Sequence, residues 1–138
     1  MSPSYNHSYL AYRIAKTLDR DEKYNIHIKM TLDIGGTDYI PDIALYEKQR
    51  IDFLHDKIKA EEPPILLVEI LSPTQAVNEI TDKFEIYFQA GVKSCWLVIP
   101  PTKTIVLFND IHHPVSYSTG LFTDPVMGAE VSVGDIFV

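Results

Sequence analysis

Cysteine is nearly absent from the chain, and long uncharged apolar runs are absent altogether. Among its 138 residues only Cys95 is a cysteine, so the chain cannot form an internal disulfide. Cys95 lies in the apolar run 95–99, where we expect a small core residue in a reducing compartment. No apolar run reaches the roughly 20 residues of a membrane-spanning helix, and residues 1–5 do not resemble a signal peptide. We expect one cytoplasmic domain over residues 1–138, with no membrane partner.

Positive charge is scarce and unevenly placed. Twelve Lys and Arg residues face nineteen Asp and Glu residues, which gives a formal net charge of −7. Such a protein does not bind polyanions by general counterion release. Residues 104–138 hold no Lys or Arg, whereas nine of the twelve lie between Arg13 and Lys59. Any nucleic-acid face should therefore involve the first helix and the segment 47–62, although a solvated helix and a charged loop would give the same distribution.

Glycine is also sparse, with six residues, and none belongs to a glycine-rich phosphate loop. This absence argues against a small-molecule-binding α/β domain, and we expect no organic cofactor.

Apolar periodicity predicts the elements of an α/β domain. A helix capped by Ser4 or Asn6 should run to about Arg20, with an apolar stripe of Leu10, Ala11, Ile14, Ala15 and Leu18. Alternation over 25–32, with Ile26, Ile28, Met30 and Leu32 on one side, predicts a half-buried strand. A glycine turn and a strand at 39–46 complete a hairpin, and a loop or short irregular helix follows at 47–62.

The pattern in residues 65–99 predicts two strands joined by a crossover helix. We expect a buried strand at 65–71, a helix at about 78–90 closed by Gly91, and strands at 94–99 and 104–108. Residues 111–138 are turn-rich with short apolar pieces. The order favours a mixed β-sheet flanked by helices, with 65–99 as a right-handed βαβ unit.

Two acidic residues interrupt apolar strands. Asp42 lies in the sequence Ile-Pro-Asp-Ile-Ala-Leu and Glu69 in Leu-Leu-Val-Glu-Ile-Leu. A buried carboxylate needs a cation, a set of hydrogen-bond donors or a raised pKa. Two of them on neighbouring strands indicate a metal site. The predicted helix after Glu69 also carries Lys83 within its apolar stripe, where its ammonium would either reach Glu69 or extend to solvent.

These residues resemble the PD-(D/E)XK nuclease superfamily. Pro41-Asp42 corresponds to "PD" and Glu69-Ile70-Leu71 to the "(D/E)XK" strand; Leu71 replaces the lysine, which many members carry on the next helix, here as Lys83. The closer resemblance is to the Uma-two family of restriction-type endonucleases. It rests on residues 41–44, 68–74, 82–92, 95–100 and 105–107, and on Ser2-Pro3 followed by His7. Family members usually begin with a further helix and an acidic strand, so we expect a shortened variant.

The resemblance implies a restriction-endonuclease-like core and a Mg²⁺-dependent endonuclease that hydrolyses DNA, with Mn²⁺ able to substitute. Asp42, Glu69 and the Ile70 carbonyl would hold the metal, and Asp42, Glu69 and Lys83 would be the catalytic residues. Tyr87 and His7 are accessory candidates. A homodimer would supply the two sites that double-strand cleavage needs.

Simpler roles are open for each residue. Asp42 would only end a strand, Glu69 and Lys83 would form a structural ion pair, Tyr87 would belong to the core, and His7 would be a surface or cap residue. The alternative function is a catalytically silent nuclease-fold protein that binds a partner. Metal binding by the carboxylates would favour the enzyme, and a dry Glu69–Lys83 pair the silent protein.

Overall fold

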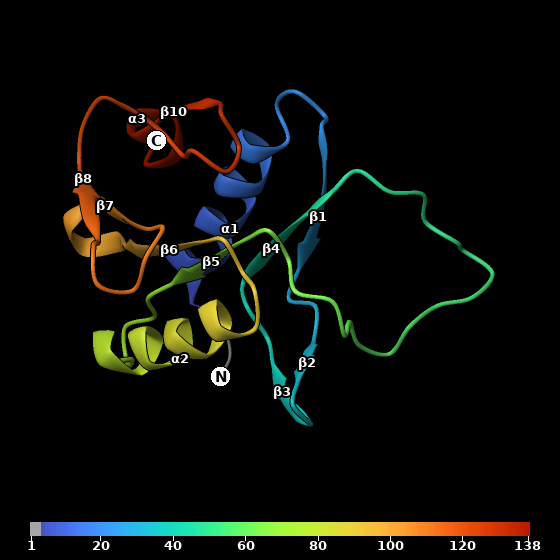
Figure 1. Ribbon diagram of the computed structural model, residues 1–138. Helices are drawn as coiled ribbons and strands as arrows, with labels where there is room; N and C mark the ends of the chain where they lie inside the picture. Colours follow the sequence, from blue (N-terminus) through green and yellow to red (C-terminus); the bar gives the residue numbers. More distant parts are fainter. Residues whose placement is uncertain (1–3) are drawn as a thin grey trace.

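The structure, a computed structural model, describes residues 4–138 and contains a six-stranded mixed sheet with helices on both faces (Figure 1). The Ser2-Pro3 part of the family resemblance lies outside the described residues. The strand order is β1-β4-β5-β6-β7-β8, and only β5 and β6 are parallel. The elements are α1 (Tyr5–Leu18), β1 (Tyr24–Ile28), β2 (Leu32–Ile34), β3 (Thr37–Tyr39), β4 (Ile43–Glu47), β5 (Leu66–Ile70), α2 (Val77–Gln89), β6 (Ser94–Ile99), a 3₁₀ turn (Pro100–Thr102), β7 (Thr104–Phe108), β8 (Val115–Tyr117), β9 (Leu121–Thr123), β10 (Glu130–Ser132) and α3 (Val133–Ile136).

The central strand β5 separates two apolar layers. Because side chains alternate along a strand, Leu66, Val68 and Ile70 pack in the layer of α1 and the C-terminal segment. Leu67 packs in the other layer, with α2 and β2. Glu69 shares the side of Leu67, so the strand directs this carboxylate toward α2. The predicted buried strand and the mixed sheet flanked by helices are confirmed.

Both long helices form where apolar periodicity places them. Ser4 caps α1 by accepting a hydrogen bond from the His7 backbone N–H at 3.3 Å, and Leu10, Ile14 and Leu18 are buried. Helix α2 buries Ile80, Phe84 and Tyr87, and Gly91 follows it at φ 110°. Burial of the apolar stripes of α1 and α2, more than intrinsic helix propensity, holds these helices on the sheet.

The predicted strand over 25–32 is wrong in one respect, because the chain breaks at Lys29. This residue has φ 54°, so β1 ends at Ile28 and β2 starts at Leu32. Strand β1 pairs with β4 in the main sheet, whereas β2 pairs with β3 in a separate ribbon. Ile28 is consequently half-exposed and not on the inward face. One alternating pattern thus covers two strands of different sheets.

The sequence predicts either a loop or a short irregular helix at 47–62, and the structure has a loop there. It leaves β4, extends away from the body and returns to β5 (Figure 1). A bridge between Leu32 and Ala60 attaches it to β2. Within residues 4–138, no helix is both long and apolar enough to cross a membrane.

The C-terminal segment forms more structure than its turn-rich sequence predicts. Strand β8 extends the sheet, and β9 pairs with β10. Asp124, fully buried, accepts hydrogen bonds from Ser94 Oγ, from Trp96 Nε1 at 2.7 Å and from the Val126 backbone N–H at 2.8 Å. One carboxylate thus joins this segment to β6.

We expect Asp124→Ala to lower the free energy of unfolding by about 2–4 kcal/mol, because it leaves buried donors without an acceptor. Urea denaturation followed by circular dichroism measures the change. The control is Asp21→Ala, at a half-exposed side chain, which should change stability by less than about 0.5 kcal/mol. Equal effects of the two substitutions would contradict the assignment.

Candidate active site

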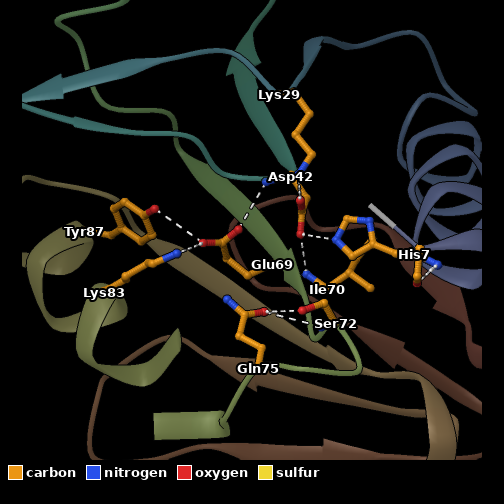
Figure 2. Close-up of polar contacts among 10 residues, drawn as sticks. His7, Lys29, Asp42, Glu69, Ile70, Ser72, Gln75, Lys83 and Tyr87 are labelled. Carbon is orange, nitrogen blue, oxygen red and sulfur yellow. Dashed lines mark hydrogen bonds and ion pairs between the residues drawn. The ribbon is translucent and has the colours of Figure 1, made fainter. Parts of the chain in front are cut away.

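Asp42 lies immediately before β4 and is surrounded by donors (Figure 2). Its Oδ2 accepts hydrogen bonds from the Ile70 backbone N–H at 2.7 Å and from His7 Nε2 at 3.1 Å. Its Oδ1 is 2.6 Å from Lys29 Nζ. The residue is 4% exposed, and these donors replace the water that burial removes from its carboxylate.

Glu69 is equally buried but has weaker partners. Its Oε1 accepts from the Asp42 backbone N–H at 3.2 Å, and its Oε2 lies 3.4 Å from the Tyr87 hydroxyl and 3.8 Å from Lys83 Nζ. The first contact ties the start of β4 to the end of β5, so it places the two carboxylic residues side by side (Figure 2).

The electrostatic environment of Glu69 opposes its ionisation. Burial and then the charge of Asp42 raise the pKa of Glu69 to about 7, against the lowering effect of Lys83, the Asp42 backbone N–H and Lys29. Burial, followed by Glu69, also raises the pKa of Tyr87 far above its ordinary value. Tyr87 therefore remains a hydroxyl that donates to Glu69.

Lys83 reaches the site from α2, where Phe84 and Tyr87 are buried beside it. Its ammonium lies 3.8 Å from Glu69, and 39% of its side chain is exposed. Asp42, Glu69 and Lys83 therefore converge, as the sequence predicts. The Glu69–Lys83 contact is long and partly solvated, unlike the dry ion pair that the silent-protein alternative requires.

His7 lies in the site, so its expected role as a surface or cap residue is wrong. It is 5% exposed, and Nε2 contacts Asp42, whereas Nδ1 has no hydrogen-bond partner within residues 4–138. His7 precedes Leu10 and Ile14 on one face of α1. Continuing the apolar stripe one turn toward the N-terminus would have predicted this burial.

Lys29 is a site residue that the sequence did not indicate. Alternation along the predicted strand makes it an outward residue, and only its left-handed backbone turns it toward Asp42. Nothing in the local pattern signals that conformation, which is uncommon for residues other than glycine.

The site offers oxygen donors for a hard cation but no complete set of ligating side chains. Within residues 4–138, no group of three or more His, Cys, Asp and Glu side chains is placed to hold a metal ion. Two adjacent buried carboxylates, one of them poorly compensated, match the oxygen ligands of Mg²⁺ when waters complete the shell. Ile70 donates its backbone N–H to Asp42, and a ligand role for its carbonyl stays a prediction.

One hollow lies away from these carboxylates. It has a volume of about 210 Å³ and is lined by residues 32–35, residues 60–63 and Ala90. None of the residues predicted for the site lines it.

Comparison with known proteins identifies the family. The protein-family model named Uma2, described as "Putative restriction endonuclease", matches residues 1–129 of this chain. The chain belongs to the Uma2 family. The predicted resemblance is thereby confirmed, and the family's description supports a nuclease function.

A solved structure gives the same fold. A crystal structure titled as a putative nuclease belonging to DUF820, from Anabaena variabilis, is 18% identical to this chain with a TM-score of 0.85. The match covers 99% of this chain and 83% of that one. No curated protein sequence matches.

We expect Glu69→Gln to stabilise the metal-free protein at alkaline pH. The folded-state pKa of about 7 exceeds the ordinary 4.5, so the folded state binds more protons between these values. Its stability therefore falls as pH rises from 4.5 to 7, and the cost stays above pH 7. In EDTA the variant should gain on the order of 2 kcal/mol at pH 8 and little near pH 4.5.

Urea denaturation at both pH values measures this difference. Glu85→Gln, at an exposed position of α2, serves as the control and should show no such dependence. If Glu69→Gln were less stable than the parent at pH 8, the ion pair with Lys83 would stabilise the folded state by more than the burial of the Glu69 charge destabilises it.

Proposed function

We propose that this Uma2 protein is a Mg²⁺-dependent endonuclease that hydrolyses DNA phosphodiester bonds, with Mn²⁺ able to replace Mg²⁺. The observation that carries the proposal is the convergence of buried Asp42 and Glu69 from adjacent strands with Lys83 from the following helix. The family match supports the same reaction class. The absence of a long apolar helix from residues 4–138 accords with a cytoplasmic enzyme.

Asp42 and Glu69, with the Ile70 carbonyl, would hold the metal ion. When bound, the ion supplies an activated water and neutralises charge on the phosphate. The residues around it have positioning roles. The Ile70 N–H and His7 fix the carboxylate of Asp42, and Tyr87 fixes that of Glu69.

Lys83 is suited to stabilise the transition state. Its ammonium lies beside Glu69 at the edge of the site and is partly exposed, so it can contact a phosphate without leaving its helix. A positioned cation stabilises negative charge that develops on the phosphoryl oxygens.

The DNA-binding face would include α1 and the loop 47–62. Lys48, Arg50 and Lys57 lie on the exposed part of this loop. Arg13 of α1 already donates to the Asp135 carbonyl at 2.6 Å, and Arg20, just after α1, donates to the Glu130 carbonyl at 3.1 Å. The loop therefore offers the freer basic groups. Two copies of the chain would be required to cut both strands in one binding event.

A second candidate is a catalytically silent nuclease-fold protein that binds a partner. One observation favours it, namely that the ammonium of Lys29 already compensates Asp42 at 2.6 Å. In that case divalent metal would bind weakly or not at all.

Plasmid nicking tests the proposal. The parent protein should convert supercoiled plasmid to nicked or linear DNA in Mg²⁺ or Mn²⁺ and not in EDTA. Asp42→Asn and Glu69→Gln should each lower the rate at least about 100-fold, because each removes a charged hard-metal ligand. Asp21→Asn is the matched control and should cut at the parental rate. Cutting by both site variants at that rate would exclude these residues from catalysis.

Lys83→Met should reduce the maximal cutting rate about 100-fold or more while leaving metal affinity within about threefold, because the ammonium is placed to stabilise the transition state. Single-turnover cleavage gives the rate, and calorimetry with Mg²⁺ gives the affinity. Lys93→Met, at an exposed lysine just beyond α2, is the control. A collapse of metal affinity together with the rate would show that Lys83 organises the metal site instead.

A further inference from the structure

We propose that Lys29 is a built-in competitor of the divalent metal: its ammonium holds Asp42 in the metal-free protein and moves to a DNA phosphate when metal binds. This inference rests on the proposed function and adds to it a means of coupling metal binding to substrate binding.

The two oxygens of the Asp42 carboxylate have different partners. Oδ2 accepts hydrogen bonds from the Ile70 backbone N–H and from His7, and neither of these donors contacts Oδ1. Lys29 Nζ lies 2.6 Å from Oδ1. A divalent cation bound to Asp42 would stand within a few ångströms of this ammonium, where like charges repel strongly. Binding of the metal therefore favours departure of the lysine.

The charges of the site favour the same exchange. With both carboxylates ionised, Asp42 and Glu69 contribute two negative charges, and Lys29 and Lys83 contribute two positive charges. A divalent cation then leaves the site with two excess positive charges. The phosphate backbone of DNA supplies the opposite charge, so metal loading and phosphate binding should support each other.

The backbone and the side chain of Lys29 differ in how firmly they are held. Its backbone is fixed to the site, since its N–H donates to the Asp42 carbonyl at 3.1 Å and its φ is 54°. Such left-handed conformations of non-glycine residues cluster at functional sites. Its side chain, however, is 41% exposed, against 6% for that of Asp42. A fixed backbone with a flexible, partly solvated ammonium allows exchange between two anions without movement of the fold.

Manganese titration of the DNA-free protein tests the competition. We expect Lys29→Met to bind Mn²⁺ about 5-fold or more tightly than the parent by calorimetry, a change of the size of ordinary coupling between sites. Lys103→Met is the matched control: Lys103 also has a positive φ, 50°, and is exposed, with no ion pair within residues 4–138. It should bind Mn²⁺ as the parent does.

Lys83→Met separates competition from loss of charge alone. It removes the same charge from the site, but Lys83 lies 3.8 Å from its carboxylate instead of 2.6 Å. The gain in Mn²⁺ affinity should therefore be larger for Lys29→Met. Lys29→Gln, whose amide still donates to Asp42, provides a second uncharged variant if the methionine variant does not fold, and Lys29→Arg should restore parental affinity.

Binding of a DNA duplex in Ca²⁺, with the duplex confirmed uncut on a gel, tests the transfer to phosphate. Lys29→Met should bind less tightly, and the slope of log affinity against log salt should fall by about one phosphate contact. Lys29→Arg should keep the parental slope, and Lys103→Met should change neither quantity.

The outcomes separate this inference from the proposed function. If the parent binds Mn²⁺ and cuts DNA but Lys29→Met has unchanged or weaker metal affinity, the competition is wrong and the nuclease stands. If the slope of log DNA affinity against log salt is the same for Lys29→Met as for the parent, Lys29 does not move to a phosphate. Mn²⁺ binding only after substitution of Lys29 would support the competition and overturn the nuclease. Absence of binding in every variant would overturn both.

Discussion

The site depends on the burial of one acidic side chain, that of Asp42. A buried carboxylate is stable only when charged or dipolar groups replace the lost hydration. Here each group comes from a different part of the fold: His7 from α1, Lys29 from the junction between β1 and β2, and the Ile70 N–H from the end of β5. The groups that replace the lost hydration of this one side chain therefore fix how α1, the junction between β1 and β2, and β5 are placed relative to one another.

The two carboxylates differ in how well they are solvated, and this difference gives them different roles. Asp42 has a close ammonium and two hydrogen bonds, whereas Glu69 has only longer contacts and a pKa raised to about 7. A binding site whose charges are fully compensated gains little from a cation. If a metal ion binds here, Glu69 would therefore supply most of the attraction, and the fixed carboxylate of Asp42 would set the position of the ion.

Sequence patterns predicted the parts of the molecule that burial determines. Asp42 and Glu69 were found because acidic residues are conspicuous in apolar strands, and Lys83 because helical spacing places it on the stripe with Phe84 and Tyr87. Patterns of apolar residues say little about backbone handedness. The φ of 54° at Lys29 splits one predicted strand into two and brings an unexpected cation to Asp42. The small strands after residue 111 were missed because the contacts of buried Asp124 with β6, which hold that segment, are long-range.

An acidic chain can act on DNA if the metal ion at the site supplies the attraction for phosphate. A protein of net charge −7 repels a polyanion at long range, and a metal-free site balanced by Lys29 and Lys83 offers no local excess of positive charge. Metal binding would give the balanced site an excess of positive charge where phosphate must lie, and screening by salt would confine that attraction to short range. Binding and catalysis would then require the same ion. The charge of Lys29 is decisive in this scheme because it determines whether the metal-free site is neutral or negative.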